Sequence, residues 1–255
     1  MTFIFKNALV RKASNNIVKA LSSKNLHPSF EKINNEHNEY IRALKKSALN
    51  VIIFEPLNDF PDSIFVEDPG LIYNNNYISL RPADKTRFGE SAVMKNEVKK
   101  LFEKIFSVNH GNIEGGDILR INDHFIIGLS SRTNHEGANS LSKILNTLGA
   151  SVEISKTPTS ILHFKSECSL IDEDTILLTE KMSENDIFKK HYKFVKIPIG
   201  EEIAANSLRV NNNLLIPSGC PKTKEMLSKN YNLIPLDVDE VFKVDAGLSC
   251  MSLRW

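Results

Sequence analysis

One short pattern returns four times along the chain and restricts its fold more than any other feature of the sequence. Each copy has an apolar strand, a tip of two or three Asn, Asp or Glu residues, and a second apolar strand. The copies span residues 70–80, 117–128, 168–179 and 206–217. Asn and Asp tolerate left-handed backbone and hydrogen-bond to their own backbone. Each copy therefore predicts a tight β-hairpin, with tips near residues 75, 123, 173 and 212.

Helical patterns follow most of these hairpins. Apolar residues recur at spacings of three and four in residues 90–106 and 134–150, and Gly149 is suited to cap the second segment. A helix over residues 221–232 would open with a proline, and an earlier amphipathic helix covers residues 29–48. The apolar positions expected in the first segment are Met94, Val98, Leu101, Phe102 and Ile105.

A single strand follows a helix at residues 50–54 and 232–236. The whole unit is therefore a hairpin, a helix and a single strand, and it returns every 40–50 residues. Such a period predicts a solenoid or a propeller. A fifth unit forms if residues 247–255 join residues 2–10, which closes a ring without edge strands. A mixed α+β sheet without symmetry is the alternative, and the pattern by itself favours neither.

Composition restricts the class of protein. The chain has 255 residues without a low-complexity segment or linker, so we expect one domain over residues 1–255. A net charge of +1 argues against binding to nucleic acid or to an anionic membrane surface. The start lacks the apolar stretch of a secretory signal, and no run approaches the ~18 residues of a membrane span. Three cysteines make a poor disulfide framework, so a reducing cytoplasm is expected.

Reactive side chains precede the first strand of the repeated hairpins. They are Glu67, Asp68, Glu114, Asp117, His163 and Cys250. Each has an ordinary explanation by itself, since a single histidine is more often structural and a single cysteine is usually a small buried hydrophobe. Their coincidence at matching positions of a repeat favours a shared site at the centre of the ring.

The chemistry of such a site points to a cationic substrate. His163 could activate the Cys250 thiol as a nucleophile, whereas neighbouring carboxylates raise the pKa of a thiol. Those carboxylates are useful if the substrate is a guanidinium, which is planar and pairs with them through several N–H donors. Arg87 and Arg132 follow the first two hairpins and would bind a substrate carboxylate, although most arginines are surface partners in salt bridges.

A series of motifs resembles a known family. In order they are FPDSIFVEDPG, RPADKTRFGE, NIEGGDIL, GLSSRTNHEGA, LHFKSECS, IAANSLRVNNNLLIPSG and DAGLSCMSLRW. They resemble the dimethylarginine dimethylaminohydrolases, closest to the short bacterial form, within the guanidine-modifying (pentein) superfamily. The resemblance spans nearly the whole chain. It implies a five-bladed α/β propeller of ββαβ units, the pentein fold.

The resemblance also implies an activity. This is hydrolysis of Nω-methylated L-arginine to L-citrulline and methylamine or dimethylamine through a covalent cysteine thiouronium, with no cofactor and no metal. It implies a small-molecule substrate and a monomer or homodimer. Carried over by motif, Cys250 is the nucleophile, His163 the general acid and base, and Glu114 holds the guanidinium and positions His163. The implied substrate-binding residues are Leu21, whose carbonyl in a lid loop would meet the α-amine, Asp62, Glu67, Asp68, Arg87 and Arg132.

Relatives and rivals remain as alternatives. Arginine deiminases of the superfamily have an acidic residue two places after the histidine, where this chain has Lys165, and amidinotransferases are much longer. Ala246 stands where a second glycine is common, which leaves substrate choice open. The second expectation is therefore a related hydrolase that acts on arginine or another guanidino compound. Two alternatives from other classes are a non-catalytic binder of arginine-like ligands and a cysteine protease. A binder has no need of a thiol nucleophile, and a closed ring leaves little room for the extended peptide that a protease binds.

Overall fold

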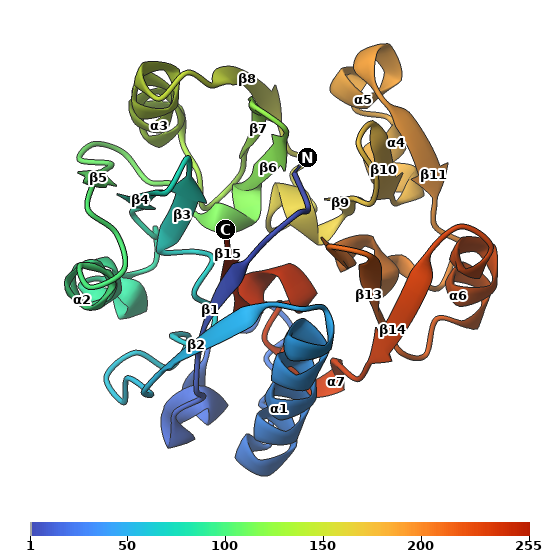
Figure 1. The fold of residues 1–255 in the computed structure, drawn as a ribbon, viewed down its shortest axis with the longest axis horizontal. Helices are drawn as coiled ribbons and strands as arrows, with labels where there is room; N and C mark the ends of the chain where they lie inside the picture. The colour runs from blue at the N-terminus through green and yellow to red at the C-terminus, as the bar shows by residue number, and fades with distance from the viewer. Residues whose placement is uncertain (1) are drawn as a thin grey trace.

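The computed structural model describes residues 2–255, apart from the side chains at positions 190 and 191, and contains five three-stranded sheets arranged around a centre (Figure 1). We call each sheet with its helix a blade. The strands nearest the centre, called inner strands, are β3 (Gly70–Tyr73), β6 (Ile118–Ile121), β9 (Cys168–Leu170), β12 (Leu208–Val210) and β15 (Leu253–Arg254). The middle strands are β4 (Asn76–Ser79), β7 (His124–Leu129), β10 (Thr175–Leu178), β13 (Asn213–Pro217) and β1 (Asn7–Arg11). The outer strands are β5 (Ile105–Ser107), β8 (Ser151–Lys156), β11 (Lys193–Lys196), β14 (Asn232–Leu236) and β2 (Asn50–Phe54).

Every blade has the same pairing. The inner strand is antiparallel to the middle strand, and the outer strand is parallel to the middle strand. A parallel pair requires a crossover, and a helical segment supplies it in each blade. The four hairpins lie where the sequence predicts them, so the propeller of ββαβ units is confirmed and the unsymmetrical sheet is excluded.

The hairpin tips show why asparagine recurs there. Asn74, Asn75, Asn122 and Asn211 all have positive φ, between 48° and 57°. Two consecutive positive φ values at Asn74 and Asn75 are those of a type I′ turn, whose twist matches that of the strands it joins. The polar tips therefore set the register of the inner strands.

The fifth blade is assembled from both ends of the described chain. Ala8 of β1 pairs with Arg254 of β15, and Leu9 pairs with Leu253. The amides of Lys6 and Asn7 also donate to the carbonyl of Trp255, at 2.8 Å each. The ring is thereby closed, as expected, and β1 has a neighbour on both sides.

The helices pack on the outside of the sheets. They are α1 (Phe30–Lys46), α2 (Glu90–Val98), α3 (His135–Thr147), α4 (Glu180–Ser183), α5 (Asp186–His191), α6 (Pro221–Ser228) and α7 (Asp239–Lys243). Gly149 follows α3 with φ of 88°, the conformation expected for a residue that ends a helix. The α2 segment is shorter than its apolar spacing indicates. Leu101 lies in a turn and Ile105 lies in β5. Both side chains pack against a core cluster after the helix has ended, so their spacing resembles that of a longer helix.

Short 3₁₀ helices stand immediately before four of the inner strands. These are η3 (Gly115–Asp117), η4 (Phe164–Ser166), η5 (Glu202–Asn206) and η6 (Leu248–Met251), while η1 (Asn15–Lys19) and η2 (Lys85–Arg87) lie farther out. The pairs η3 and η4, η4 and η5, and η3 and η6 contact one another. They gather loop residues from separate blades at the centre of the ring.

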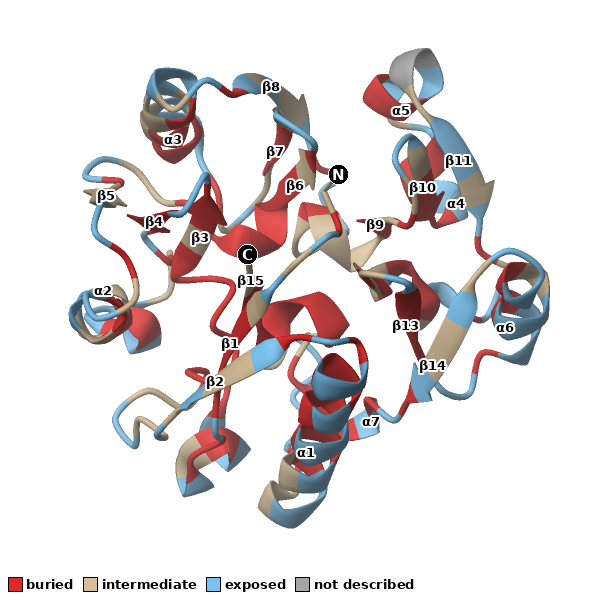
Figure 2. Cartoon of the chain, in the orientation of Figure 1, coloured by how far each residue is buried: buried red, intermediate tan, exposed pale blue. Residues whose placement is uncertain are grey.

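The hydrophobic core is divided among the blades. Five clusters of buried apolar side chains lie around the ring, and burial is concentrated on the inner parts of the sheets while the outer helix faces are exposed (Figure 2). Within residues 2–255 no helix is long and apolar enough to cross a membrane.

Candidate active site

Residues from seven separate segments of the chain meet at one cavity of about 30 Å³. Eight of the nine residues expected at the site line it, and they are Leu21, Asp62, Asp68, Arg87, Glu114, Arg132, His163 and Cys250. The ninth, Glu67, does not line it. The ring of short helices explains this convergence, because Glu114, His163 and Cys250 stand at the start of η3, at the start of η4 and inside η6.

His163 and Glu114 form a short contact at the cavity. The Nε2 atom of His163 lies 2.7 Å from Oε2 of Glu114. Burial alone would lower the pKa of His163, but the hydrogen bond to Glu114 and the charges of Asp68 and Asp117 raise this pKa to about 9. At neutral pH the ring therefore carries two protons, and it enters the reaction as an acid.

The two glycines of the EGGD motif allow this arrangement. A Cβ atom at Gly115 would lie 1.9 Å from the carbonyl oxygen of Glu67, and one at Gly116 would lie 2.8 Å from Cγ of His163. Neither distance is possible for a real side chain. The glycines therefore let η3 pack against both the acidic loop and the histidine.

Glu114 is fixed from three directions. Its Oε1 accepts a hydrogen bond from the backbone N–H of Ala83 at 2.9 Å and lies 3.6 Å from Nη1 of Arg132. Its Oε2 faces His163. The carboxylate is 1% exposed, so its orientation is set before any ligand arrives.

Asp68 lies between an arginine and a backbone amide. Its Oδ2 is 2.6 Å from Nη1 of Arg87, and its Oδ1 accepts from the N–H of Gly116 at 3.2 Å. Burial would raise the pKa of Asp68, but the charge of Arg87 holds it below its usual value. The carboxylate is therefore ionised and available to a cation.

Arg87 is more constrained than the sequence suggests. Its Nε and Nη2 atoms face the Glu90 carboxylate at 2.7 and 2.8 Å, and its side chain is 4% exposed. Arg132 differs because its side chain is 19% exposed. The two-nitrogen edge of Arg87 is thus occupied, and Arg132 has the more accessible guanidinium for a ligand. Glu90 was missed in the sequence, although its place three residues after Arg87 could have indicated the pair.

Cys250 also lines the cavity. Its thiol is buried, and burial together with the charges of Glu67 and Asp68 raises its pKa to about 12. The thiol is therefore protonated at neutral pH in the unliganded protein. Cys168 is also buried, with its Sγ 3.4 Å from the carbonyl of Phe164, and Cys220 lies in another core cluster. All three cysteines are unpaired.

Leu21 and its loop form one wall of the cavity. The backbone N–H of Leu21 donates to both oxygens of Asp62, at 3.2 and 3.4 Å, and burial raises the pKa of Asp62 to about 6. Farther along, the Ser23 hydroxyl donates to Asp245 at 2.8 Å. Asp245 was not expected at the site; it holds a backbone φ of 57° beside Ala246, and both line the cavity.

Glu67 and Asp117 support the site from behind. Glu67 turns to the opposite side of the ring, where Lys165 lies 2.5 Å from its Oε1 and the Ser249 hydroxyl donates to its Oε2 at 3.0 Å. Asp117 accepts from the Ser130 hydroxyl at 2.7 Å and from the N–H of Phe164 at 2.8 Å. Because Phe164 follows His163, Asp117 fixes the loop that carries the histidine.

Among the side chains that the structure describes, one group has the spacing of metal ligands. Single atoms of Asp68, Glu114 and His163 all lie within 4.8 Å of one another. The Nε2 atom of His163 is already bonded to Glu114, and Asp68 is bonded to Arg87. The raised pKa of His163 places a proton where a metal would require a lone pair. The cluster is therefore explained by ion pairing.

Known proteins match this chain over its whole length. The N(G),N(G)-dimethylarginine dimethylaminohydrolase of Pseudomonas aeruginosa is 34% identical and aligns over 99% of this chain and 100% of its own. The enzyme of that name from Streptomyces coelicolor is 28% identical over 98% of this chain and 96% of its own. The model of the arginine deiminase family matches residues 91–215.

Solved structures agree with these relatives. The Pseudomonas aeruginosa enzyme, as a Cys-to-Ser variant complexed with citrulline, superposes with a TM-score of 0.95 and covers 99% of this chain and 100% of its own. The N-terminal domain of ArgZ, a cyanobacterial arginine dihydrolase, superposes with a TM-score of 0.85 at 17% identity over 97% of this chain and 96% of its own, which shows a shared fold. Fold, site geometry and sequence identity together show that this chain belongs to the dimethylarginine dimethylaminohydrolase family.

Proposed function

We propose that this protein hydrolyses Nω-methylated L-arginine to L-citrulline and methylamine or dimethylamine. The observation that carries the proposal is the meeting of a thiol, an imidazolium–carboxylate pair and a buried ionised aspartate in one cavity, at Cys250, His163–Glu114 and Asp68. The relatives that match along the full chain bear the name of that activity. The reaction needs no group beyond the substrate, water and these side chains.

Substrate binding prepares the nucleophile. The guanidinium of the substrate would pair with Asp68 and Glu114, which brings a positive charge next to the Cys250 sulfur. A neighbouring cation favours the thiolate, so the pKa of Cys250 falls on binding and the proton leaves to water. His163 is already protonated and does not compete for that proton.

Two chemical steps follow. The thiolate attacks the guanidinium carbon, and His163 gives its proton to the methylated nitrogen, which departs as the amine while a thiouronium forms on Cys250. Water then attacks the thiouronium carbon and gives a proton to the now neutral His163. Collapse of that adduct expels the Cys250 sulfur, which takes up the remaining hydroxyl proton and returns to the thiol, and leaves the ureido group of citrulline. Glu114 stabilises the imidazolium before the first step and after the second.

The amino-acid end of the substrate has its own partners. Arg132 would bind the carboxylate, with the remaining N–H of Arg87 as a second donor. The Leu21 carbonyl and Asp62 would receive the α-amine, and the loop that carries Leu21 would cover the bound molecule. Glu67 would act through its charge on Cys250; a direct contact with substrate, as the family resemblance implies, stays a prediction.

We further propose one catalytic domain over residues 1–255, acting in the cytoplasm as a monomer or homodimer. Free thiols at all three cysteines are in keeping with a reducing compartment.

A second candidate is an arginine hydrolase of the same superfamily. The match of residues 91–215 to the arginine deiminase family model favours it. Against it, Lys165 stands two places after His163 and is bound to Glu67, so no carboxylate is available there.

One assay separates the two candidates. Citrulline formation is measured in parallel from L-arginine, monomethyl-L-arginine and asymmetric dimethyl-L-arginine. We expect turnover of the methylated substrates to exceed that of arginine. A preference for arginine would replace the first candidate with the second, and no citrulline from any of the three would reject both.

A further inference from the structure

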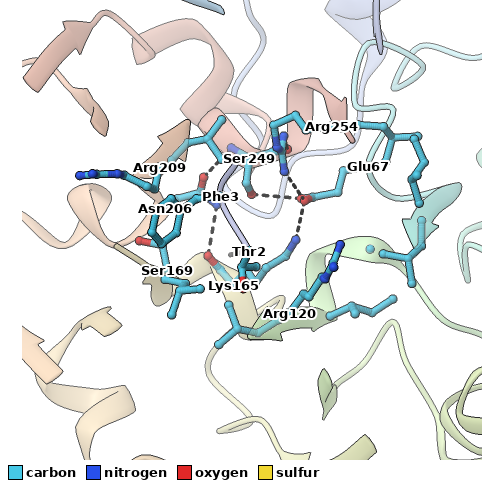
Figure 3. A pocket seen from close by; sticks show the side chains of 18 of the residues that line it. Thr2, Phe3, Glu67, Arg120, Lys165, Ser169, Asn206, Arg209, Ser249 and Arg254 are labelled. Carbon is cyan, nitrogen blue, oxygen red and sulfur yellow. Dashed lines mark hydrogen bonds and ion pairs between the residues drawn. The ribbon is translucent and has the colours of Figure 1, made fainter. Parts of the chain in front are cut away.

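A second cavity, of about 140 Å³, lies among the inner strands and is bordered by the Glu67 side chain (Figure 3). Residues from the inner strands of all five blades line it. Its walls carry four cationic side chains, Arg120, Lys165, Arg209 and Arg254, and a single carboxylate, Glu67. This charge balance differs from that of the catalytic cavity, where carboxylates are prominent.

Three of these cations occupy one repeated position of the propeller. In each blade one residue of the inner strand pairs with the second residue of the middle strand. The five pairs are Ile72 with Tyr77, Arg120 with Phe125, Leu170 with Ile176, Arg209 with Leu214, and Arg254 with Ala8. All five inner-strand members line the cavity. The three arginines therefore line this cavity because they occupy equivalent positions of the repeated blade.

A structural role accounts for only some of the N–H groups of these three arginines. The Nε atoms of Arg120 and Arg209 donate to the carbonyls of Asn122 and Asn211, at 2.8 and 3.0 Å, and so brace the hairpin tips. Their terminal nitrogens are not needed for that role. Arg254 has no such tip to brace, and its Nη1 instead bonds the Ser252 carbonyl at 2.7 Å.

Several buried donors at this cavity lack an acceptor. Seven buried polar atoms of the described side chains have no hydrogen-bond partner, and three of them belong to residues that line this cavity. They are Nη1 of Arg209, Nε of Arg254 and Oγ of Ser169. Guanidinium nitrogens only donate, so what these sites require is an acceptor. A buried donor without an acceptor destabilises the folded protein.

The positive charge is also incompletely balanced. Glu67 serves two cations at once, with Lys165 at 2.5 Å and Arg254 at 3.4 Å. In the described chain no carboxylate lies within 4.0 Å of Arg120 or Arg209, which instead stack on Tyr73 at 4.8 Å and on Tyr231 at 5.2 Å. Burial lowers the pKa of Arg120 even though the charge of Asp123 opposes the shift. Burial without full pairing favours an anionic partner.

We propose that this cavity binds a small oxyanion, carried by a phosphate or carboxylate group, between Arg120, Lys165 and Arg254. Figure 3 shows these three side chains gathered about Glu67, while Arg209 extends away and marks the far edge of the site. The volume is about ten times the space that one water requires, so an ion of several heavy atoms fits. The N-terminal residues Thr2 and Phe3 border the site and would be ordered by the ligand.

An anion bound in this cavity would affect the catalytic cavity through Glu67. The backbone N–H of Glu67 donates to the carbonyl of Cys250 at 3.2 Å, and the charge of Glu67 raises the pKa of the Cys250 thiol. An oxyanion that shares Lys165 and Arg254 leaves Glu67 less neutralised. Saturating ligand therefore raises the thiol pKa further and slows alkylation of Cys250 at a fixed pH.

The test uses calorimetric titration of the full chain with inorganic phosphate and, separately, with succinate. An Arg132→Ala background removes the exposed guanidinium of the catalytic cavity, which could bind the same anions. In that background we expect saturable binding of one ion. Arg120→Gln should weaken it about tenfold or more, the value of one charge-assisted hydrogen bond. Arg42→Gln is the matched control, because Arg42 is an exposed arginine outside the cavity, and it should leave binding unchanged.

The outcomes separate the alternatives. Binding of phosphate alone or of succinate alone supports the site and identifies its source of oxyanion. Equal binding in Arg120→Gln and Arg42→Gln overturns it, as does an absence of saturable binding, since water would then satisfy the donors. If Arg120→Gln does not fold, anomalous diffraction from wild-type crystals soaked in selenate decides. A peak between Arg120 and Arg254 supports the proposal, and a peak elsewhere or none rejects it.

Discussion

Cys250, His163 and Glu114 show how neighbouring residues give one another their chemistry. Burial and the charges of Glu67 and Asp68 keep the Cys250 thiol protonated. Glu114, Asp68 and Asp117 keep the His163 imidazole protonated. In the unliganded protein the Cys250 sulfur is therefore uncharged and the His163 imidazole is positively charged. A cationic substrate would convert the thiol to a thiolate and leave the imidazole protonated. Substrate binding and activation of the nucleophile are then a single event.

The identity of the nucleophile is tested by substitution of the cysteines. Cys250→Ser should abolish turnover with little change in the unfolding midpoint, because a hydroxyl at this place cannot be activated by the same charges. Cys220→Ser is the control, since Cys220 lies in a core cluster away from the cavity, and it should retain nearly full activity. Citrulline release and thermal unfolding are measured for both. Equal losses of activity would refute the assignment.

The ionisation of Cys250 is measured by the rate of thiol alkylation against pH. With its pKa raised to about 12, the resting thiol should react slowly at neutral pH and still gain rate above pH 9. A guanidinium ligand that cannot react should move the profile to lower pH. A resting pKa well below ~8.5, the value of a free cysteine, would contradict the assignment.

His163 makes stability depend on pH. Its pKa in the folded protein, about 9, lies above the value of about 6.5 in an unfolded chain. The stabilisation is fully present below pH 6.5 and is lost as the pH rises through 9, and it amounts to about 3 kcal/mol. Urea unfolding of wild type and of His163→Gln should therefore differ most near pH 6. An equal difference at pH 6 and pH 10 would show that the imidazolium is not stabilised.

At the scale of elements, the strands and hairpins were predictable and the short helices were not. Short apolar runs are local signals, so β2 and β14 begin and end where the sequence indicates. The 3₁₀ helices η3, η4 and η6 depend on contacts between blades, which no local pattern contains. The pairing of Arg87 with Glu90 was missed for a different reason, since its three-residue spacing is visible in the sequence but was not interpreted as an ion pair.

The two arginines of the predicted carboxylate clamp should respond differently to mutation. Arg132→Lys should raise KM with some loss of kcat, since lysine lacks the planar fork and remote binding energy also positions the guanidinium carbon. The free energy of unfolding of Arg132→Lys should change little. Arg87→Ala should raise KM as well, and should also cost about 3–5 kcal/mol of folding free energy because Asp68 and Glu90 lose their buried partner.

Steady-state kinetics and urea unfolding separate these effects. Agmatine-like substrates lack the carboxylate, so they should be poor for wild type and lose little further in Arg132→Lys. Turnover of an agmatine derivative as fast as methylarginine would show that the clamp assignment is wrong.

On the scale of the whole molecule, the ring is completed by a short strand. Leu253 of β15 is 5% exposed and packs with Leu9 and Val66. Leu253→Ala should cost about 2–5 kcal/mol, the range for a buried leucine. Because β15 follows η6 directly, the loss should also lower kcat. Ile199, which is 84% exposed, offers a control in Ile199→Ala, which should leave both unchanged. Full activity in Leu253→Ala would show that β15 does not position Cys250.

The pairing of β1 with β15 has a consequence for the order of folding. Four blades are made of continuous stretches of chain, whereas the fifth joins residues about 245 positions apart, Leu9 and Leu253. Closing so long a loop costs more entropy than closing a hairpin, and contacts of large sequence separation form slowly. Cys250 lies in η6, next to the strand that makes this long-range pairing, and we expect that segment to join last. Refolding chains should therefore acquire secondary structure first and catalysis later, in the step that turns a chain of blades into a ring.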